Sequence, residues 1–301
     1  MTIAEQRSRP DRERHAERLL RASAEHSYDP LTEIDWDRPL AGDLFYVPPH
    51  RSTLWGTPLW DQLSHEQRVA LTRHEVASLA GMGIWFEQIL IQMVIRYTYD
   101  RDPRSRHVQY AWTEIADECR HMVMFGRFID KLDCPPYTPN RLHHNLGRVF
   151  KAVSNPIECF AGALIAEEIP DTFQREAMAD ESLQPIVREV ARLHVVEEAR
   201  HVRYAREELA RRWPKLREPQ RTINRFTIAR AAQEISRGLV RPGVYAAVGL
   251  DPREASRVAR RNPHVHATLQ WSAARLVVFF EEIGLLRGPT TAMWRRAHLL
   301  A

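Results

Sequence analysis

The stretch that decides the fold of this chain is HVVEEARH, residues 194–201, which places His194, Glu198 and His201 at intervals of four and three residues. On an α-helix these three side chains share one narrow face, so all of them can address a single point. A second Glu-x-x-His motif begins at Glu118. One such motif is common by chance, and its repetition is what makes it informative.

The two motifs belong to an internal repeat. Glu87 lies 31 residues before Glu118, and Glu167 lies 31 residues before Glu198, each in an otherwise apolar stretch. One constant offset of 80 relates the two sets, which are Glu87, Glu118 and His121 in the first and Glu167, Glu198 and His201 in the second. The repeat predicts two similar helix pairs, and it selects one glutamate from each adjacent acidic pair.

Buried glutamates on apolar helix faces need a compensating charge. Burying one unpaired carboxylate costs several kcal/mol, so four converging carboxylates would repel strongly. Two divalent ions would neutralise all four. One Glu from each of two helices, with Glu-x-x-His from the other two, is the arrangement of ferritin-like di-iron proteins. We therefore predict an all-α fold, a ferritin-like four-helix bundle with additional N- and C-terminal helices.

His194 breaks the symmetry of the repeat, because the residue 80 positions earlier is Glu114. The full set resembles the AurF-type di-iron N-oxygenases, typified by p-aminobenzoate N-oxygenase, whose mark is an additional histidine one turn before the last motif. The resemblance implies seven metal ligands: Glu87, Glu118, His121, Glu167, His194, Glu198 and His201. It also implies two iron ions, O2 as co-substrate, and oxygenation of an amine to a hydroxylamine and on to nitroso or nitro products. It assigns no catalytic residue beyond these ligands.

Other functions fit the same motifs. A di-iron hydroxylase or desaturase acting on carbon would use both Glu-x-x-His motifs, although a plain desaturase would not need His194. A ferritin-like iron-binding protein would not need the roughly 90 residues that follow the bundle. A helical module without metal is the third alternative. Asp117 and Glu197 precede the two motif glutamates, and we expect them to orient histidines, with Arg120 and Arg200 as candidate partners.

Few glycines and the dominance of Ala, Leu, Arg and Glu predict helix almost throughout. We expect an N-terminal helix and an extended arm over residues 1–63, followed by a single helical domain over residues 64–301. The helix is expected to start just after Pro10. The arm is expected to pack on the body through its aromatic residues, which are Trp36, Phe45, Trp55 and Trp60.

Within the domain, we expect the bundle over about residues 84–212 and flanking helices over 219–299. The bundle helices are predicted at 84–99, 106–132, 156–180 and 184–212, and the flanking helices near 219–238, 252–261 and 264–286. A capping box at Ser64 and Gln67 predicts a helix running to about Ala80, with Gly81 and Gly83 marking a kink or a break.

Composition limits the partners. The 43 basic and 39 acidic residues are interspersed, so we expect no nucleic-acid partner. The three cysteines form no CxxC pair, no apolar signal region opens the chain, and no apolar run approaches a membrane span. We expect a cytoplasmic protein with no membrane contact. Its expected partners are a small-molecule amine and an external electron donor that no flavin or nicotinamide motif identifies, with a homodimer expected only by analogy with such bundles.

Overall fold

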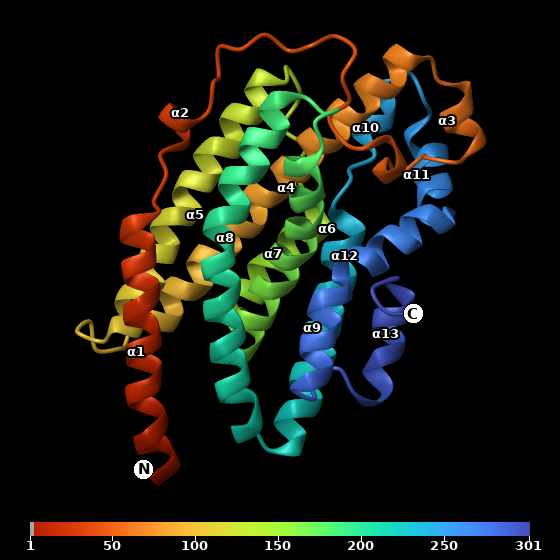
Figure 1. Cartoon of the computed structure of the whole chain (residues 1–301). Coiled ribbons are helices and arrows are strands. Elements are labelled where there is room, and N and C mark those ends of the chain that lie inside the picture. The colour runs from red at the N-terminus through yellow and green to blue at the C-terminus, as the bar shows by residue number, and fades with distance from the viewer. Residues whose placement is uncertain (1–2) are drawn as a thin grey trace.

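Four long helices form the centre of the computed structural model, which describes residues 3–301, with side chains from residue 11 on (Figure 1). They are α4 (His65–Thr98), α5 (Arg106–Lys131), α7 (Pro156–Ala179) and α8 (Pro185–Arg212). The short connections make α4–α5 and α7–α8 two antiparallel pairs, and the pairs pack against each other through α4 with α7 and α5 with α8. The predicted all-α, ferritin-like four-helix bundle is confirmed.

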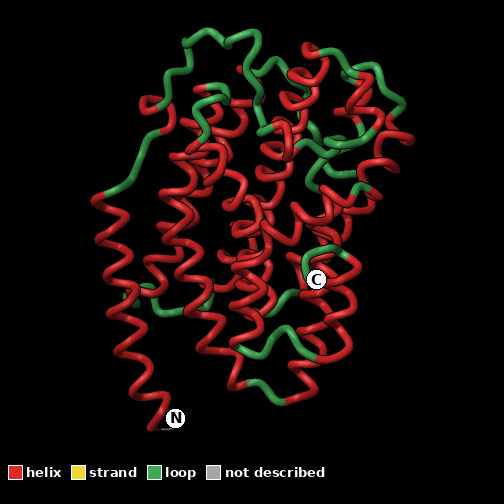
Figure 2. Tube along the Cα trace, turned by 45° about the vertical axis from the view of Figure 1, so that its right-hand side comes forward, coloured by secondary structure: helices red, strands yellow, loops and turns green. Residues whose placement is uncertain are grey.

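Further helices cover the bundle. α1 (Ile3–Glu25) lies along α5 and α8, α6 (Arg141–Val153) lies on α4, and both α9 (Glu218–Gly238) and α12 (Pro263–Glu282) lie on α7. Figure 2 shows most of the long helices running along one direction, with many of the loops gathered at the two ends. The shorter elements are α2 (Pro30–Glu33), η1 (Pro49–Arg51), α3 (Pro58–Gln62), η2 (Trp213–Lys215), α10 (Gly243–Ala246), α11 (Pro252–Arg261), η3 (Gly288–Thr290) and α13 (Thr291–Arg296).

The start of α4 confirms the predicted capping box, because the Ser64 side chain accepts from the Gln67 backbone and the Gln67 side chain accepts from the Ser64 backbone. The predicted break at Gly81 and Gly83 is wrong, since α4 continues through both, whereas a kink there stays a prediction. A Cβ atom at Gly81 would lie 2.6 Å from the backbone oxygen of Tyr137. The glycine therefore lets another segment approach the helix closely, and packing outweighs its low helix propensity.

Two other helices differ from expectation. α1 begins at Ile3, before Pro10, so the prediction that it starts after the proline is wrong. The helix thus continues through Pro10, although a proline removes one helical hydrogen bond. α6 was not predicted; its Asn140 side chain accepts from the backbone of His143, and Gly147 lets it approach Trp85 on α4.

The arm before α4 contacts the body at several points. Trp36 and Trp60 are buried, whereas Phe45 and Trp55 are partly buried. The Ala41 backbone nitrogen donates to Gln184 Oε1 at 3.1 Å, which ties the arm to the start of α8. The division into an arm over residues 1–63 and a single domain over residues 64–301 stays a prediction.

Among the described helices, α4 alone is long and apolar enough, by length and composition, to cross a membrane. Its mean hydropathy reaches 1.4 over 18 residues, and 44% of that window is buried inside the protein. Its apolar residues Phe86, Leu90 and Met93 lie in the main hydrophobic core. Packing within the bundle accounts for these apolar residues, and the absence of a membrane span stays a prediction.

Candidate metal centre

All seven residues predicted as ligands meet in the middle of the four-helix bundle, and none of them is more than 6% exposed. Each helix contributes at the same level: α4 supplies Glu87, α5 supplies Glu118 and His121, α7 supplies Glu167, and α8 supplies His194, Glu198 and His201. The apolar faces that bury these side chains also hold the helices together. The centre therefore lies in the hydrophobic core rather than at its edge.

The side chains fall into overlapping groups whose candidate ligand atoms lie within 4.8 Å of one another. The groups are Glu87 with His121 and His194; Glu118 with His121 and Glu198; Glu167 with His194 and Glu198; and Glu114 with Glu118 and His201. Glu118, His121, His194 and Glu198 each occur in two groups. Such shared residues are what a centre for two neighbouring ions requires.

The two motif histidines are held in a crosswise manner. His121 on α5 donates from Nε2 to Glu197 Oε2 on α8 at 2.9 Å. His201 on α8 donates from Nε2 to Asp117 Oδ2 on α5 at 3.1 Å. Each outer acid therefore orients the histidine of the other helix pair, not the histidine of its own motif. This leaves both Nδ1 atoms facing the inner carboxylates, at 2.9 Å from Glu118 Oε2 for His121.

Two arginines surround the outer acids, as the sequence indicated. Arg120 forms an ion pair with Asp117 and lies 3.8 Å from Glu197. The Arg200 guanidinium lies 3.6 Å from Asp117 and 3.7 Å from Glu197. The two negative charges of the outer acids are thus matched by the two positive charges of the arginines. The four charges cancel, so they do not neutralise the carboxylates at the centre.

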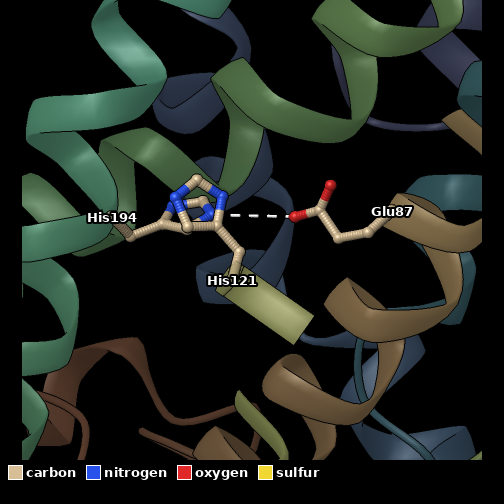
Figure 3. Close-up of side chains that lie close together, drawn as sticks. All are labelled: Glu87, His121 and His194. Atoms are coloured by element: carbon tan, nitrogen blue, oxygen red, sulfur yellow. Dashed lines mark ion pairs between the residues drawn. The ribbon is translucent and has the colours of Figure 1, made fainter. Parts of the chain in front are cut away.

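His194 has a different environment from the motif histidines. Its Nδ1 donates to Gln174 Oε1 on α7 at 2.7 Å, so its Nε2 is left without a proton and points inward. That Nε2 lies 3.7 Å from Glu87 Oε1 and has no hydrogen-bond partner among the described residues. Figure 3 shows the His121 and His194 rings lying against each other and facing Glu87. Their ring centroids are 4.5 Å apart.

The electrostatics of this cluster call for positive charge. Burial raises the pKa of Glu87 well above its usual value, and the carboxylates of Glu118 and Glu167 raise it further. Burial also raises the pKa of Glu167, and Glu198 adds to that shift. Burial alone would lower the pKa of His121, but its bonds to acids, beginning with Glu118, outweigh burial and raise it well above the usual value. A metal cation at the centre would offset the same clustered carboxylates.

The donor set fits a pair of transition-metal ions. Buried atoms without a hydrogen-bond partner gather at the centre: Glu87 Oε2, Glu118 Oε1, His194 Nε2 and Glu198 Oε2. Unpartnered buried acceptors are costly unless a ligand takes them up. Carboxylates combined with neutral imidazoles suit iron, manganese and zinc, and the absence of a cysteine donor argues against a soft-metal site.

A cavity of about 100 Å³ adjoins the centre on one side along the bundle axis. Glu87, Glu167 and His194 form its floor, and Gln174 lies in its wall. The remaining lining is mostly apolar and includes Phe86, Phe125, Phe128, Phe173 and Val190. We call this side the cavity end of the bundle.

On the opposite side the interior is filled by aromatic rings. Ring centroids lie 4.9 Å apart for Tyr110 and Tyr204, 5.7 Å for Phe160 and Tyr204, and 5.2 Å for Tyr97 and Phe160. The Tyr204 ring also stacks on the buried His107. We call this side the packed end.

Two residues of the centre lie outside the predicted set. Glu114, one turn before Glu118, groups with His201, and the repeat offset had already pointed to it as the counterpart of His194. Gln174 orients His194, and no sequence signal marked it. A single glutamine within a helix has no pattern of its own, so only the packing of α7 against α8 reveals it.

Comparisons with known proteins extend these observations. Residues 9–284 match the family described as p-aminobenzoate N-oxygenase AurF. Two curated relatives, "Uncharacterized protein Rv0885" of Mycobacterium tuberculosis and "Uncharacterized protein Mb0909" of Mycobacterium bovis, are each 31% identical over 210 residues. The alignment covers 67% of this chain and 62% of each relative, so the chain spans less than two thirds of their length. A solved R2-like ligand-binding oxidase mutant with an aerobically reconstituted Mn/Fe cofactor aligns at 12% identity over 95% of this chain and 89% of its own, with a TM-score of 0.40.

Proposed function

Because this chain belongs to the p-aminobenzoate N-oxygenase AurF family, we propose that it is a di-iron N-oxygenase that oxygenates the nitrogen of a small amine. The observation that carries the proposal is His194, whose Nε2 points into the centre beside Glu87. The reaction inserts one atom of O2 between nitrogen and hydrogen and gives a hydroxylamine. The second oxygen atom leaves as water, with two protons and two electrons from an external donor. Further turnovers would give nitroso and nitro products.

Seven residues would hold the two iron ions: Glu87, Glu118, His121, Glu167, His194, Glu198 and His201. When bound, the ions supply the redox capacity for reducing O2 and polarise the oxygen ligands. Four carboxylates balance the charge of two divalent ions.

The protein prepares the ligand atoms through hydrogen bonds. Glu197 and Asp117 hold the Nε2 protons of His121 and His201, so each Nδ1 presents a lone pair to the centre. Gln174 holds the Nδ1 proton of His194 and so frees its Nε2. Three imidazoles are thereby fixed in the tautomer that binds metal.

The cavity end would position the substrate. Its aromatic and aliphatic lining excludes water and favours an amine with an apolar body. No Lys or Arg is among the described residues that line it, and Glu176 at its wall is paired with Arg51 at 2.8 Å. An apolar cavity of about 100 Å³ is smaller than the roughly 150 Å³ cavity known to accept benzene, so a ring-sized substrate requires some side-chain movement.

The proposal is tested by loading the purified full chain anaerobically with Fe(II), adding a chemical reductant and O2, and supplying a panel of arylamines and alkylamines. Mass spectrometry should detect products that carry one oxygen atom from isotopically labelled O2 on nitrogen. Products oxygenated on carbon would favour the hydroxylase alternative. Iron oxidation without any oxygenated product would favour an iron-binding function.

A further inference from the structure

Glu114 is a buried acid at the centre that the proposed ligand set does not use. It lies on α5 one turn before Glu118, with 3% of its surface exposed. One of its carboxylate oxygens lies within 4.8 Å of candidate ligand atoms of Glu118 and His201. Its Oε2 atom has no hydrogen-bond partner among the described residues. The carboxylate therefore lies next to the centre, and one of its two oxygens is satisfied by none of the described residues.

Other buried glutamates of this chain do have such partners. Glu75 Oε1 accepts from the backbone and side chain of Thr53 at 2.9 and 2.6 Å, although Glu75 Oε2 has no hydrogen-bond partner among the described residues. Glu168 is paired with Arg206, and Glu208 accepts two bonds from Arg12. Leaving a buried carboxylate without such a partner is costly. Glu114 thus has the burial of these residues without their compensation, and a cation at the centre would supply it.

The repeat gives Glu114 a defined position. His194 lies exactly one repeat length after it, since 194 − 114 = 80. In the structure, His194 on α8 groups with His121 on α5, and Glu114 on α5 groups with His201 on α8. The crosswise pattern of the two helix pairs therefore includes this fourth position, where one pair has a histidine and the other has a glutamate.

We propose that Glu114 is an eighth metal-binding residue, the counterpart of His194, and that it makes the two metal positions chemically unequal. The position towards the cavity end is faced by Glu87, His121 and His194. The position towards the packed end is faced by Glu114, Glu118 and His201. This inference rests on the proposed two-metal centre, and it goes beyond that centre in its donor set.

Unequal donors have a chemical consequence. A position with two imidazoles suits the later divalent metals, whereas a position with one imidazole and more carboxylates suits harder ions such as Mn²⁺. The position next to the cavity, where the substrate would lie, is the nitrogen-rich one. The two positions should therefore fill with different affinities, and removing Glu114 should weaken one of them alone.

The test titrates the metal-free full chain with Co²⁺ and follows stepwise binding by calorimetry and by the visible spectrum. Wild-type protein should bind two ions in two steps. Glu114→Gln should keep one step and weaken the other about tenfold or more, as expected for a lost contact at a metal. Glu114→His introduces the residue type of its repeat counterpart, His194. This variant should bind two ions in two steps again, and the added nitrogen ligand should shift the visible spectrum. Glu75→Gln is the matched control, because it alters an equally buried acid outside the centre and should leave both steps unchanged.

A second measurement does not depend on how the variants fold. Anomalous scattering from Co²⁺ in crystals of the wild-type protein should place one ion about 2 Å from a Glu114 oxygen. Two ions bound with no contact to Glu114, or unchanged steps in Glu114→Gln, would overturn the inference and leave the proposed function standing. Wild-type protein that binds no ion would overturn both.

Discussion

The interior of the bundle is filled differently on the two sides of the candidate metal centre. At the cavity end, small and branched residues such as Gly83, Ala166 and Val190 leave about 100 Å³ open above the floor of ligands. At the packed end, Tyr110 and Tyr204 fill the same cross-section with rings 4.9 Å apart. The same four helices line both ends, and the cavity end is also lined by Tyr46, Val47, Pro48 and Leu239. Side-chain volume and these additional segments therefore both contribute to the difference.

This difference indicates the side from which a substrate can reach the centre. A substrate that enters at the cavity end meets Glu87, Glu167 and His194 first. His201 and Glu114 lie on the other side, next to the aromatic rings of the packed end. The residue that distinguishes this centre from a plain ferritin-like one, His194, is therefore also the histidine that faces the open side.

The largest effect is expected from a substitution that disrupts the metal centre, which lies between the two ends. Glu198→Ala deletes a carboxylate that belongs to two of the ligand groups. It should abolish iron loading at one position at least, and all oxygenation. Bound iron per chain is measured by elemental analysis after desalting. Glu168→Gln is the control, since Glu168 is equally buried but paired with Arg206, and it should keep its iron. A Glu198→Ala protein that retains two irons would show that the centre is elsewhere.

The second prediction changes the cavity end alone. Ala166 lines the cavity, and replacing it with Leu adds three carbon atoms to that space. Ala166→Leu should retain iron and lower product formation about tenfold or more, because misplaced reactants lose the benefit of orientation. Ala166 also lines a neighbouring pocket of about 280 Å³ beneath α6. The control is therefore Ala163→Leu, one turn away on α7, which lines that neighbouring pocket but not the cavity. Equal activity of the two variants would mean that the substrate does not use the cavity.

The third prediction concerns Glu208, which lies beyond the packed end among His107, Arg12 and Arg212. Burial would raise the pKa of Glu208, but His107, Arg12 and Arg212 outweigh burial and lower it to about 2. A lowered carboxyl pKa stabilises the fold above the unfolded value near 4.5, and this stabilisation is lost as the pH falls towards 2. Glu208→Gln should therefore lower the free energy of unfolding by about 3 kcal/mol at pH 7.

That destabilisation should shrink as the pH falls below about 4.5, in urea titrations at several pH values. Iron content should stay at the wild-type level throughout, because Glu208 belongs to none of the ligand groups. A loss of iron in folded Glu208→Gln protein would link the packed end to metal binding and weaken the contrast between the two ends.

The smallest expected effect tests how well the packed end is filled. The Tyr110 hydroxyl is fully buried and has no hydrogen-bond partner among the described residues. Tyr110→Phe should change the free energy of unfolding by less than about 1 kcal/mol and leave iron binding unchanged, because it removes an unsatisfied polar atom. If chemical denaturation shows that the free energy of unfolding falls by several kcal/mol, the hydroxyl has a hydrogen-bond partner. The packed end would then be stabilised by polar contacts as well as by ring packing.

Much of the centre was predictable because its residues obey a spacing rule. An offset of 80 selected Glu167 over Glu168, and the structure places Glu167 in a ligand group while Glu168 pairs with Arg206. Helix geometry carries such information, since residues three and four apart share a face. The same rule indicated Glu114, although only the packing of α5 against α8 shows that its carboxylate reaches His201.

Other features depended on contacts that no local pattern contains. Gly81 predicted a break in α4, but the close approach of the Tyr137 backbone explains the glycine within a continuous helix. The outer acids were expected to orient histidines, yet the pairing of Asp117 with His201 requires knowing which helices face each other. The cavity depends on the volumes of side chains from all four helices, and periodicity says nothing about their sum.

The crosswise bonds from His121 to Glu197 and from His201 to Asp117 have a consequence for assembly. Both bonds join α5 to α8, and they run in opposite senses between the two helices. A slip of one helix past the other by a single turn, about 5.4 Å, would break both at once. The bonds thus fix the axial alignment of two helices that come from different halves of the chain. Each half of the chain depends on an acid from the other half to orient its motif histidine, so the two halves must assemble together.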